Sequence, residues 1–417
     1  MTKLSDQCYT SDPNRKTLAE ALDMLRTRVQ CVVGKDTISL SSACGRILAM
    51  PVIAPRHVPA VDNSALDGFA LRVADLKKPG VNKLPVSGYV PAGSALAPPL
   101  DEGKVVQILT GAPIPPGADA VVMTEQTQLE GGNVILPANI EHGQNIRQAG
   151  EDMRAGGQVL SPGCRLRPQD IGLIATNGMA EVSVFEPLKV ALFSTGNEVL
   201  EPGMPFQAGS VYDANRYMLC AALEAWGCAV SDMGILPDDK KQVRNALADA
   251  AGTHQAVITS GGASRSNEDH VVPSVLDLGD VYFRQMAIKP GRPIAFGQIG
   301  AATFIGLPGN PVAALVCLLR IGRPVLGALA GRSWLDPIPY KVSAAFAMNK
   351  KPGRREFLRG HLSGEKAGPV VHKFSPEGSG ILTSLTQTHG LIELAEEVEA
   401  VKVGDLVDYI SYAEYLF

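Results

Sequence analysis

Residues 306–311 read Gly-Leu-Pro-Gly-Asn-Pro, and an apolar run that predicts a helix follows at 312–319. Gly306 and Gly309 permit backbone angles that other residues resist, whereas Pro308 and Pro311 restrict φ and stiffen the turn. Pro311 suits the first turn of a helix, where its missing N–H costs no hydrogen bond. The stretch predicts a rigid loop ending at a helix N-terminus, which favours an anion. Taken alone, this stretch is better explained as an ordinary turn before a buried helix. The interpretation as an anion site therefore needs support from other loops.

The segment around this loop alternates predicted strands with predicted helices. Such alternation predicts a doubly wound α/β domain with a mostly parallel sheet and helices on both faces. In such a domain, ligands bind beyond the carboxyl ends of the strands. The strands are expected at 189–193, 229–234, 256–259, 281–287, 293–296 and 303–306, and the helices at 216–225, 240–251 and 271–278.

Small residues, carboxylates and two cations follow these strands. Glycines let backbone N–H groups approach oxyanions, and Mg²⁺ is typically held by one or two carboxylates together with substrate phosphates. The composition therefore predicts a phosphate site with a hard metal. The candidate ligand-binding residues are Ser194, Thr195, Gly196, Ser260, Gly261, Gly262, Ser264, Lys289, Arg292, Pro308, Gly309, Asn310 and Pro311, and the carboxylates beside them are Glu198, Asp238 and Asp269.

Each of these residues also has an ordinary interpretation. Thr195 and Ser260 are typical helix N-caps, and a cap of the helix from 240 is the favoured interpretation of Asp239. Lys289 and Arg292 are equally consistent with a solvated pair of surface charges. The shared position at strand ends favours the functional interpretation of the group as a whole.

The 417 residues are too many for one hydrophobic core, so several domains are expected. The segment after the α/β domain is predicted to form a β-barrel or sandwich. The expected divisions are a mobile tail at 1–15, a helix at 16–36 that packs on the α/β domain, a β-rich connecting domain at 37–56 and 157–186, an inserted β-rich domain at 57–156, the α/β domain at 187–336 and a C-terminal β domain at 337–417.

Composition excludes several classes of function. The net charge of -4 leaves no basic excess for general nucleic-acid binding. The N-terminal residues have no apolar core of a signal peptide, and no run of about 18 apolar residues predicts a membrane span. The seven cysteines form no C-x-x-C pair, which favours reduced thiols and a cytoplasmic location.

Three stretches of the β-rich half, 62–70, 109–119 and 147–152, are rich in turn residues and carry carboxylates. Physical chemistry alone slightly favours surface turns for them. Together with the strand-end motifs, however, these stretches resemble the molybdopterin molybdenumtransferase family, the bacterial MoeA proteins and the gephyrin E domain. The resemblance runs from Leu18 to the end of the chain and rests on seven blocks in family order: 62–70, 109–119, 147–152, 194–198, 260–269, 287–292 and 306–311.

The resemblance implies an enzyme that inserts molybdenum from molybdate into adenylated molybdopterin, with Mg²⁺-assisted release of AMP. It also implies a homodimer of elongated subunits, whose active cleft lies between the α/β domain of one subunit and the β-rich part of the other. The implied partners are molybdopterin adenylyltransferase and downstream molybdoenzymes or their chaperones, with no nucleic acid and no membrane.

The family's functional residues can be carried over one by one. Asp238 and Asp269, with Glu198 as a further candidate, would hold Mg²⁺, and Glu198 and Asp67 would act near molybdate or the attacking water. The other implied site residues are Asp152, Thr110, Lys289, Pro308 and Pro311. One block departs from the family pattern, because Arg265 replaces a small apolar residue and Ser266 replaces a glycine.

Three other functions remain open. A molybdopterin adenylyltransferase would share the α/β domain but lack the long β-rich segment. A non-catalytic carrier or scaffold on the same fold would bind partners without turnover, although the acids kept at every mapped position make this less favoured. A periplasmic oxyanion-binding protein would need a signal peptide.

Overall fold

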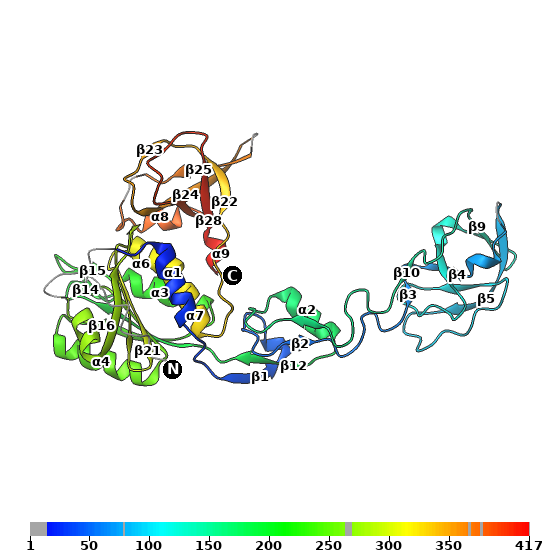
Figure 1. Cartoon of the computed structure of the whole chain (residues 1–417), viewed down its shortest axis with the longest axis horizontal. Coiled ribbons are helices and arrows are strands. Elements are labelled where there is room, and N and C mark those ends of the chain that lie inside the picture. The colour runs from blue at the N-terminus through cyan, green and yellow to red at the C-terminus, as the bar shows by residue number, and fades with distance from the viewer. Residues whose placement is uncertain (1–14, 78–79, 263–268, 366–367, 376–377, 417) are drawn as a thin grey trace.

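The computed structural model describes residues 15–77, 80–262, 269–365, 368–375 and 378–416. The predicted tail therefore falls almost wholly outside the described residues. The molecule is elongated: the α/β domain and the C-terminal barrel lie side by side at one end, and the inserted domain lies at the other (Figure 1). The connecting domain joins the two ends. The predicted class, α/β plus β in an elongated multidomain chain, is confirmed.

A six-stranded sheet forms the centre of the α/β domain, in the order β16-β13-β17-β21-β20-β18. The first four strands are parallel, and β20 runs against both of its neighbours. The carboxyl ends of β13, β16, β17 and β21 therefore meet at one edge. The strands are β13 (Lys189–Thr195), β16 (Ala229–Leu236), β17 (Ala256–Ser260), β18 (Gly279–Gln285), β20 (Pro293–Ile299) and β21 (Ala302–Leu307).

Helices cover both faces of this sheet, as the alternation predicts. Val190 and Leu192 of β13 pack in one core with α1, α3 and α6, whereas Ala191 and Phe193 pack in a second core with α4 and α5. Alternate side chains of a strand thus reach opposite layers. The helices are α1 (Leu18–Arg28), α3 (Ala214–Ala225), α4 (Lys240–Thr253), α5 (Val271–Leu278), α6 (Pro311–Cys317) and α7 (Arg323–Leu329).

The helix after the Gly-Leu-Pro-Gly-Asn-Pro loop is longer than predicted. It continues from α6 through a π-helical turn, η5 (Leu318–Gly322), into α7. The turn's wider hydrogen-bond pattern accommodates Pro324, which would interrupt a regular helix. Pro311–Leu329 is long and apolar enough to cross a membrane by length and composition alone, although Arg320 and Arg323 interrupt its apolar residues. Because 78% of the apolar 18-residue stretch of this helix is buried inside the protein, we assign the helix to the core.

Five strands of the C-terminal domain close into a barrel, since β24, β25, β22, β28 and β26 pair in turn and β26 pairs back with β24. A short strand, β19, pairs with β24 and joins the barrel to the α/β domain. The elements are β19 (Ile288–Lys289), β22 (Tyr340–Ala344), β23 (Met348–Asn349), β24 (Arg355–Glu365), β25 (Gly368–Lys373), α8 (Thr383–Thr386), β26 (Gly390–Leu394), β27 (Ala400–Val401), β28 (Leu406–Ser411) and α9 (Tyr412–Leu416).

The two β-rich domains carry short strands. The inserted domain has a six-stranded sheet, β7-β4-β6-β5-β9-β8, and the connecting domain has the pairs β1–β12 and β2–β11. The inserted elements are β3 (Asn63–Ser64), β4 (Gly68–Leu71), η3 (Val73–Asp75), β5 (Asn82–Val90), β6 (Val105–Ile108), β7 (Ala120–Met123), η4 (Thr124–Gln126), β8 (Gln128–Glu130), β9 (Asn133–Leu136) and β10 (Ile146–Arg147). The connecting elements are β1 (Lys35–Ser39), η2 (Leu40–Ser42), β2 (Val52–Ile53), β11 (Gln158–Leu160), α2 (Pro168–Thr176) and β12 (Glu181–Phe185).

Closure of the barrel depends on a close backbone approach at Gly390, where an added Cβ would lie 2.2 Å from the carbonyl oxygen of Ile410. We expect Gly390→Ala to lower the free energy of unfolding by about 1–3 kcal/mol, the usual cost of overpacking. Gly364→Ala is the matched control, because a Cβ there meets no atom within 4 Å. Equal urea-unfolding midpoints for the two variants would contradict this account.

Candidate functional site

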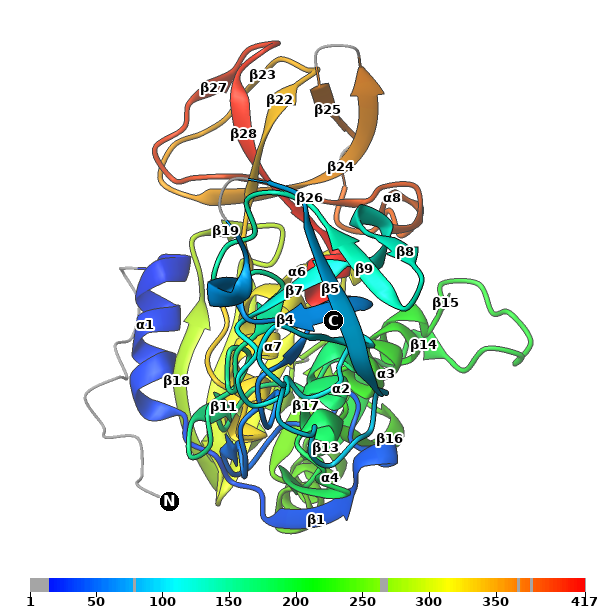
Figure 2. The same cartoon turned by 90° about the vertical axis from the view of Figure 1, so that its right-hand side faces the viewer.

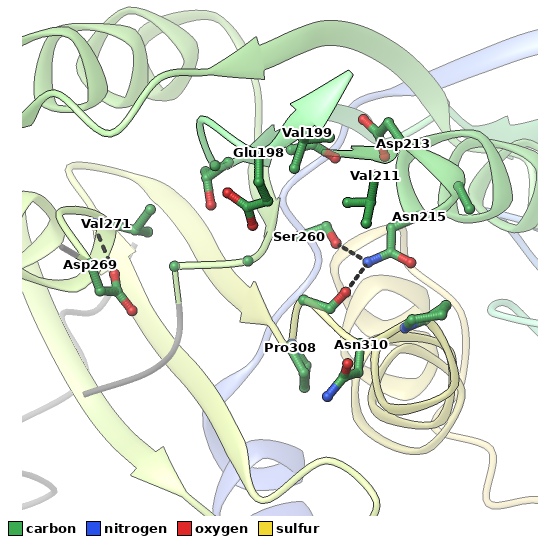
Figure 3. A pocket seen from close by; sticks show the side chains of 18 of the residues that line it. Glu198, Val199, Val211, Asp213, Asn215, Ser260, Asp269, Val271, Pro308 and Asn310 are labelled. Atoms are coloured by element: carbon green, nitrogen blue, oxygen red, sulfur yellow. Dashed lines mark hydrogen bonds between the residues drawn. The ribbon is translucent and has the colours of Figure 1, made fainter. Parts of the chain in front are cut away.

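A cavity of about 620 Å³ opens at the carboxyl edge of the sheet (Figure 3). The loops after β13, β16, β17 and β21 line it, so the parallel strands bring together the motifs that the sequence analysis singled out. The predicted residues that line the cavity are Ser194, Thr195, Gly196, Glu198, Asp238, Ser260, Gly261, Gly262, Asp269, Pro308, Gly309, Asn310 and Pro311.

Two glycines let the β17 loop pack against its neighbours. Gly261 and Gly262 have φ values of +92° and +73°, which other residues rarely adopt. A Cβ on Gly261 would lie 2.6 Å from Oγ1 of Thr195, and one on Gly262 would lie 2.2 Å from a methyl carbon of Val271. Any larger residue would therefore push this loop away from the β13 loop and from α5.

Asn215, in the first turn of α3, ties two of these loops together. Its Nδ2 donates to Oγ of Ser260 at 2.8 Å and to the carbonyl oxygen of Gly309 at 2.7 Å. Asp213 caps the same helix by accepting from the backbone N–H of Arg216. The sequence patterns did not reveal Asn215. Asp213 is a typical N-cap residue and places Asn215 in the first turn of the helix, but no local pattern indicates hydrogen bonds to residues as distant in the chain as Ser260 and Gly309.

Among the described residues, four carboxylates line the cavity. Asp213 is paired with Arg216, and the other three come from different loops. Asp238 and Asn197 exchange hydrogen bonds, each accepting from the other's backbone N–H at 3.1 Å, which joins the ends of β16 and β13. Asp269 accepts from the N–H of Val271 at 3.2 Å, and Glu198 is exposed. Asp239, by contrast, caps α4 by accepting from the N–H of Gln242, which confirms the ordinary interpretation of that residue.

The carboxylates offer hard oxygen donors of the kind that Mg²⁺ prefers. Within the part of the chain that the structure describes, however, no three His, Cys, Asp or Glu side chains are arranged to hold a metal by themselves. The donor set therefore fits a metal that takes one or two ligands from the protein and the others from phosphates or water.

Lys289 and Arg292 lie outside this cavity. They line a neighbouring cavity of about 290 Å³ that shares Pro293, Pro308 and Asn310 with the first. Pairing of β19 with β24 places Lys289 opposite the buried Glu356, at 3.4 Å from Nζ to Oε2. The other basic residues of this neighbouring cavity, which we call the basic pocket, are Arg15, Arg354 and Arg359.

Asp67 precedes β4 and Thr110 follows β6 in the inserted domain, and Asp152 follows β10 in the segment that leads back to the connecting domain. The inserted domain lies at the end of the molecule opposite the α/β domain (Figure 1). Oδ1 of Asp67 accepts from both the backbone N–H and the hydroxyl of Thr110, each at 2.7 Å. These two bonds hold the pKa of Asp67 below its ordinary value. Ser264, Arg265 and Ser266 lie outside the described residues.

Comparison with known proteins identifies the family. Three family descriptions match in chain order: "MoeA N-terminal region (domain I and II)" at 16–178, "Probable molybdopterin binding domain" at 191–328 and "MoeA C-terminal region (domain IV)" at 341–412. The chain belongs to the MoeA family. The resemblance found in the sequence is thereby confirmed over most of the chain.

Named relatives of this MoeA chain are enzymes. Molybdopterin molybdenumtransferase of Haemophilus influenzae is 36% identical, over 94% of this chain and 97% of the relative. Molybdopterin molybdenumtransferase 2 of Mycobacterium tuberculosis is 35% identical, over 88% and 93%. The crystal structure of the molybdopterin biosynthesis MoeA protein from Pyrococcus horikoshii OT3 is 28% identical, covers 96% of this chain and all of its own, and has a TM-score of 0.82. Sequence and fold thus assign the same family.

The hydrogen bonds of Asn215 predict a loss of stability when its amide is removed. In Asn215→Ala, the buried Ser260 hydroxyl and the Gly309 carbonyl lose their shared donor, and we expect a loss of about 1–3 kcal/mol in urea unfolding. Ser260→Ala removes one acceptor and keeps the bond to Gly309, so its loss should be smaller. A larger loss in Ser260→Ala than in Asn215→Ala would contradict this role.

The hydrogen bonds of Thr110 predict the titration of Asp67. Thr110→Val removes the hydroxyl donor and keeps the backbone donor, so the carboxylate is less stabilised and its pKa should rise toward the ordinary value. Thr110→Ser keeps the hydroxyl and should leave the pKa low. Carbon-detected NMR titration of the Asp67 carboxyl measures this, and an unchanged pKa in Thr110→Val would show that the hydroxyl has no effect.

Proposed function

We propose that this chain is a cytoplasmic molybdopterin molybdenumtransferase, which inserts molybdenum from molybdate into adenylated molybdopterin with Mg²⁺-assisted release of AMP. One observation carries the proposal: a cavity lined by Glu198, Asp238 and Asp269 at the sheet edge of a chain that is 36% identical, over nearly its full length, to an enzyme of that name. A molybdopterin adenylyltransferase is less favoured, because the matched family descriptions extend over the β-rich and C-terminal domains.

The loops after β13, β17 and β21, which we call the cavity floor, would bind the phosphates. Pro308, Gly309 and Asn310 stand before the first turn of the helix that starts at Pro311, and a helix N-terminus favours negative charge. The hydroxyls of Thr195 and Ser260 line the same floor. Rigid turns keep these donors in place without ligand, which reduces the entropy lost on binding.

Asp238 and Asp269 would hold Mg²⁺ against these phosphates, with Glu198 as an alternative to one of them. A bound Mg²⁺ would neutralise the phosphate charge and favour departure of AMP. Asp238 is oriented for this task by its two hydrogen bonds with Asn197. Glu198, which is exposed to the cavity, would orient molybdate or the attacking water.

The basic pocket would attract molybdate. Lys289, Arg292, Arg354 and Arg359 give it an excess of positive charge, although the buried Glu356 offsets part of it. Because this pocket shares Pro308 and Asn310 with the main cavity, a dianion held there would lie next to the bound substrate.

A second copy of the chain would complete the site. Asp67, Thr110 and Asp152 do not line the cavity of their own chain, and the inserted domain lies at the far end of the molecule. A homodimer in which each inserted domain reaches the partner's cavity would bring them together. This reaction would take its substrate from a molybdopterin adenylyltransferase. It would deliver its product to molybdoenzymes or their chaperones.

A single-turnover assay tests the proposal. We expect purified protein mixed with adenylated molybdopterin, Mg²⁺ and molybdate to release AMP and to activate a cofactor-free molybdoenzyme. Asp269→Asn and Glu198→Gln remove a charge at the proposed metal or reaction centre and should each slow AMP release at least about 100-fold.

Asp239→Asn is the matched control for this assay. It removes a neighbouring carboxylate charge but keeps an N-cap residue for α4, so it should release AMP at the wild-type rate. Full activity of both cavity variants would overturn the site assignment. Tight binding of substrate by the wild-type protein, without AMP release or activation, would instead identify a carrier or scaffold.

A further inference from the structure

Two valines form an apolar wall on one side of the cavity. Val199 of β14 (Val199–Leu200) and Val211 of β15 (Val211–Tyr212) lie opposite each other in a short parallel ladder, and both line the cavity. Val211 is 55% exposed, so this face is not covered by the chain itself. Phosphate, metal and molybdate are charged and gain nothing from contact with an apolar surface. An apolar part of the ligand is therefore expected to contact the valines.

The wall is held firmly although its loop projects from the α/β domain (Figure 2). The N–H of Val211 donates to the carbonyl of Glu198, and the N–H of Asp213 donates to that of Leu200, each at 2.9 Å. The buried Arg216 pairs with both Asp213 and Glu201, which fixes the ladder to α3. The valines therefore offer a preformed surface.

The wall and the residues shared with the basic pocket lie on different sides of the cavity. In Figure 3 the valines are seen on the side of Ser260 and Asn215 away from Pro308 and Asn310, the two residues shared with the basic pocket. A ligand whose phosphates rest on the floor would place one end at the basic pocket and extend another toward the valines. Adenylated molybdopterin carries a flat heteroaromatic ring, pterin or adenine, at each end.

We propose that Val199 and Val211 form the subsite for one of these rings, a proposal that rests on the proposed function. A flat ring laid on the four valine methyl groups would remove apolar surface of both partners from water. Replacement of both valines by alanine removes these methyl groups, so we expect the affinity for the ring-bearing ligand to fall about tenfold. Ligands without a ring should bind as before.

Isothermal titration with AMP, molybdopterin and inorganic pyrophosphate, each with Mg²⁺, tests the subsite in the Val199→Ala/Val211→Ala variant. A tenfold loss for AMP alone would assign the subsite to adenine, and a loss for molybdopterin alone would assign it to pterin. Affinity for pyrophosphate should stay within about twofold of the wild type, because the floor is untouched.

Met204→Ala is the control variant, because Met204 is 55% exposed on the same loop and does not line the cavity. An equal loss in this control, or unchanged affinity of the double variant for both ring-bearing ligands, would overturn the subsite. A third outcome would also overturn the subsite: light scattering shows that the double variant is a monomer, and titration shows that it binds AMP normally. The wall would then contact the partner subunit rather than a ring of the ligand. Wild-type protein that binds neither AMP nor molybdopterin would contradict the proposed function itself.

Discussion

The parallel pairing of β13, β17 and β21 is the constraint on which the site depends. It brings three loops from distant parts of the chain to one edge, where the side chain of Asn215 joins two of them. Glycines with positive φ let these loops approach to van der Waals contact. The cavity is therefore a consequence of sheet register and backbone turns.

The second constraint is the separation of the functional groups. One end of the elongated chain carries the cavity, the basic pocket and the apolar wall, and the other carries Asp67 and Thr110 (Figure 1). The two hydrogen bonds from Thr110 orient the Asp67 carboxylate and hold its pKa below the ordinary value. Neither the cavity nor the basic pocket is lined by Asp67, which is why we propose that a partner subunit brings it to the site.

Sequence patterns predicted the local elements and the strand-end motifs well, because hydrophobic periodicity and turn residues are local signals. They placed Glu198, Asp238 and Asp269 correctly around one cavity. They did not separate Lys289 and Arg292 into a neighbouring pocket, because that separation depends on the long-range pairing of β19 with β24. The role of Asn215 and the π-helical turn before Pro324 were missed for the same reason: each depends on contacts or helix geometry that composition does not encode.

The central claim is that the active site combines the cavity of one subunit with the inserted domain of its partner. Heterodimers of an Asp67→Asn subunit and an Asp269→Asn subunit test it most directly. If the claim is right, one site carries both substitutions and the other none, so purified heterodimers should release AMP at about half the wild-type rate although each homodimer is inactive. Heterodimers as inactive as the two homodimers would show that the acids of one chain act together, and would contradict the account.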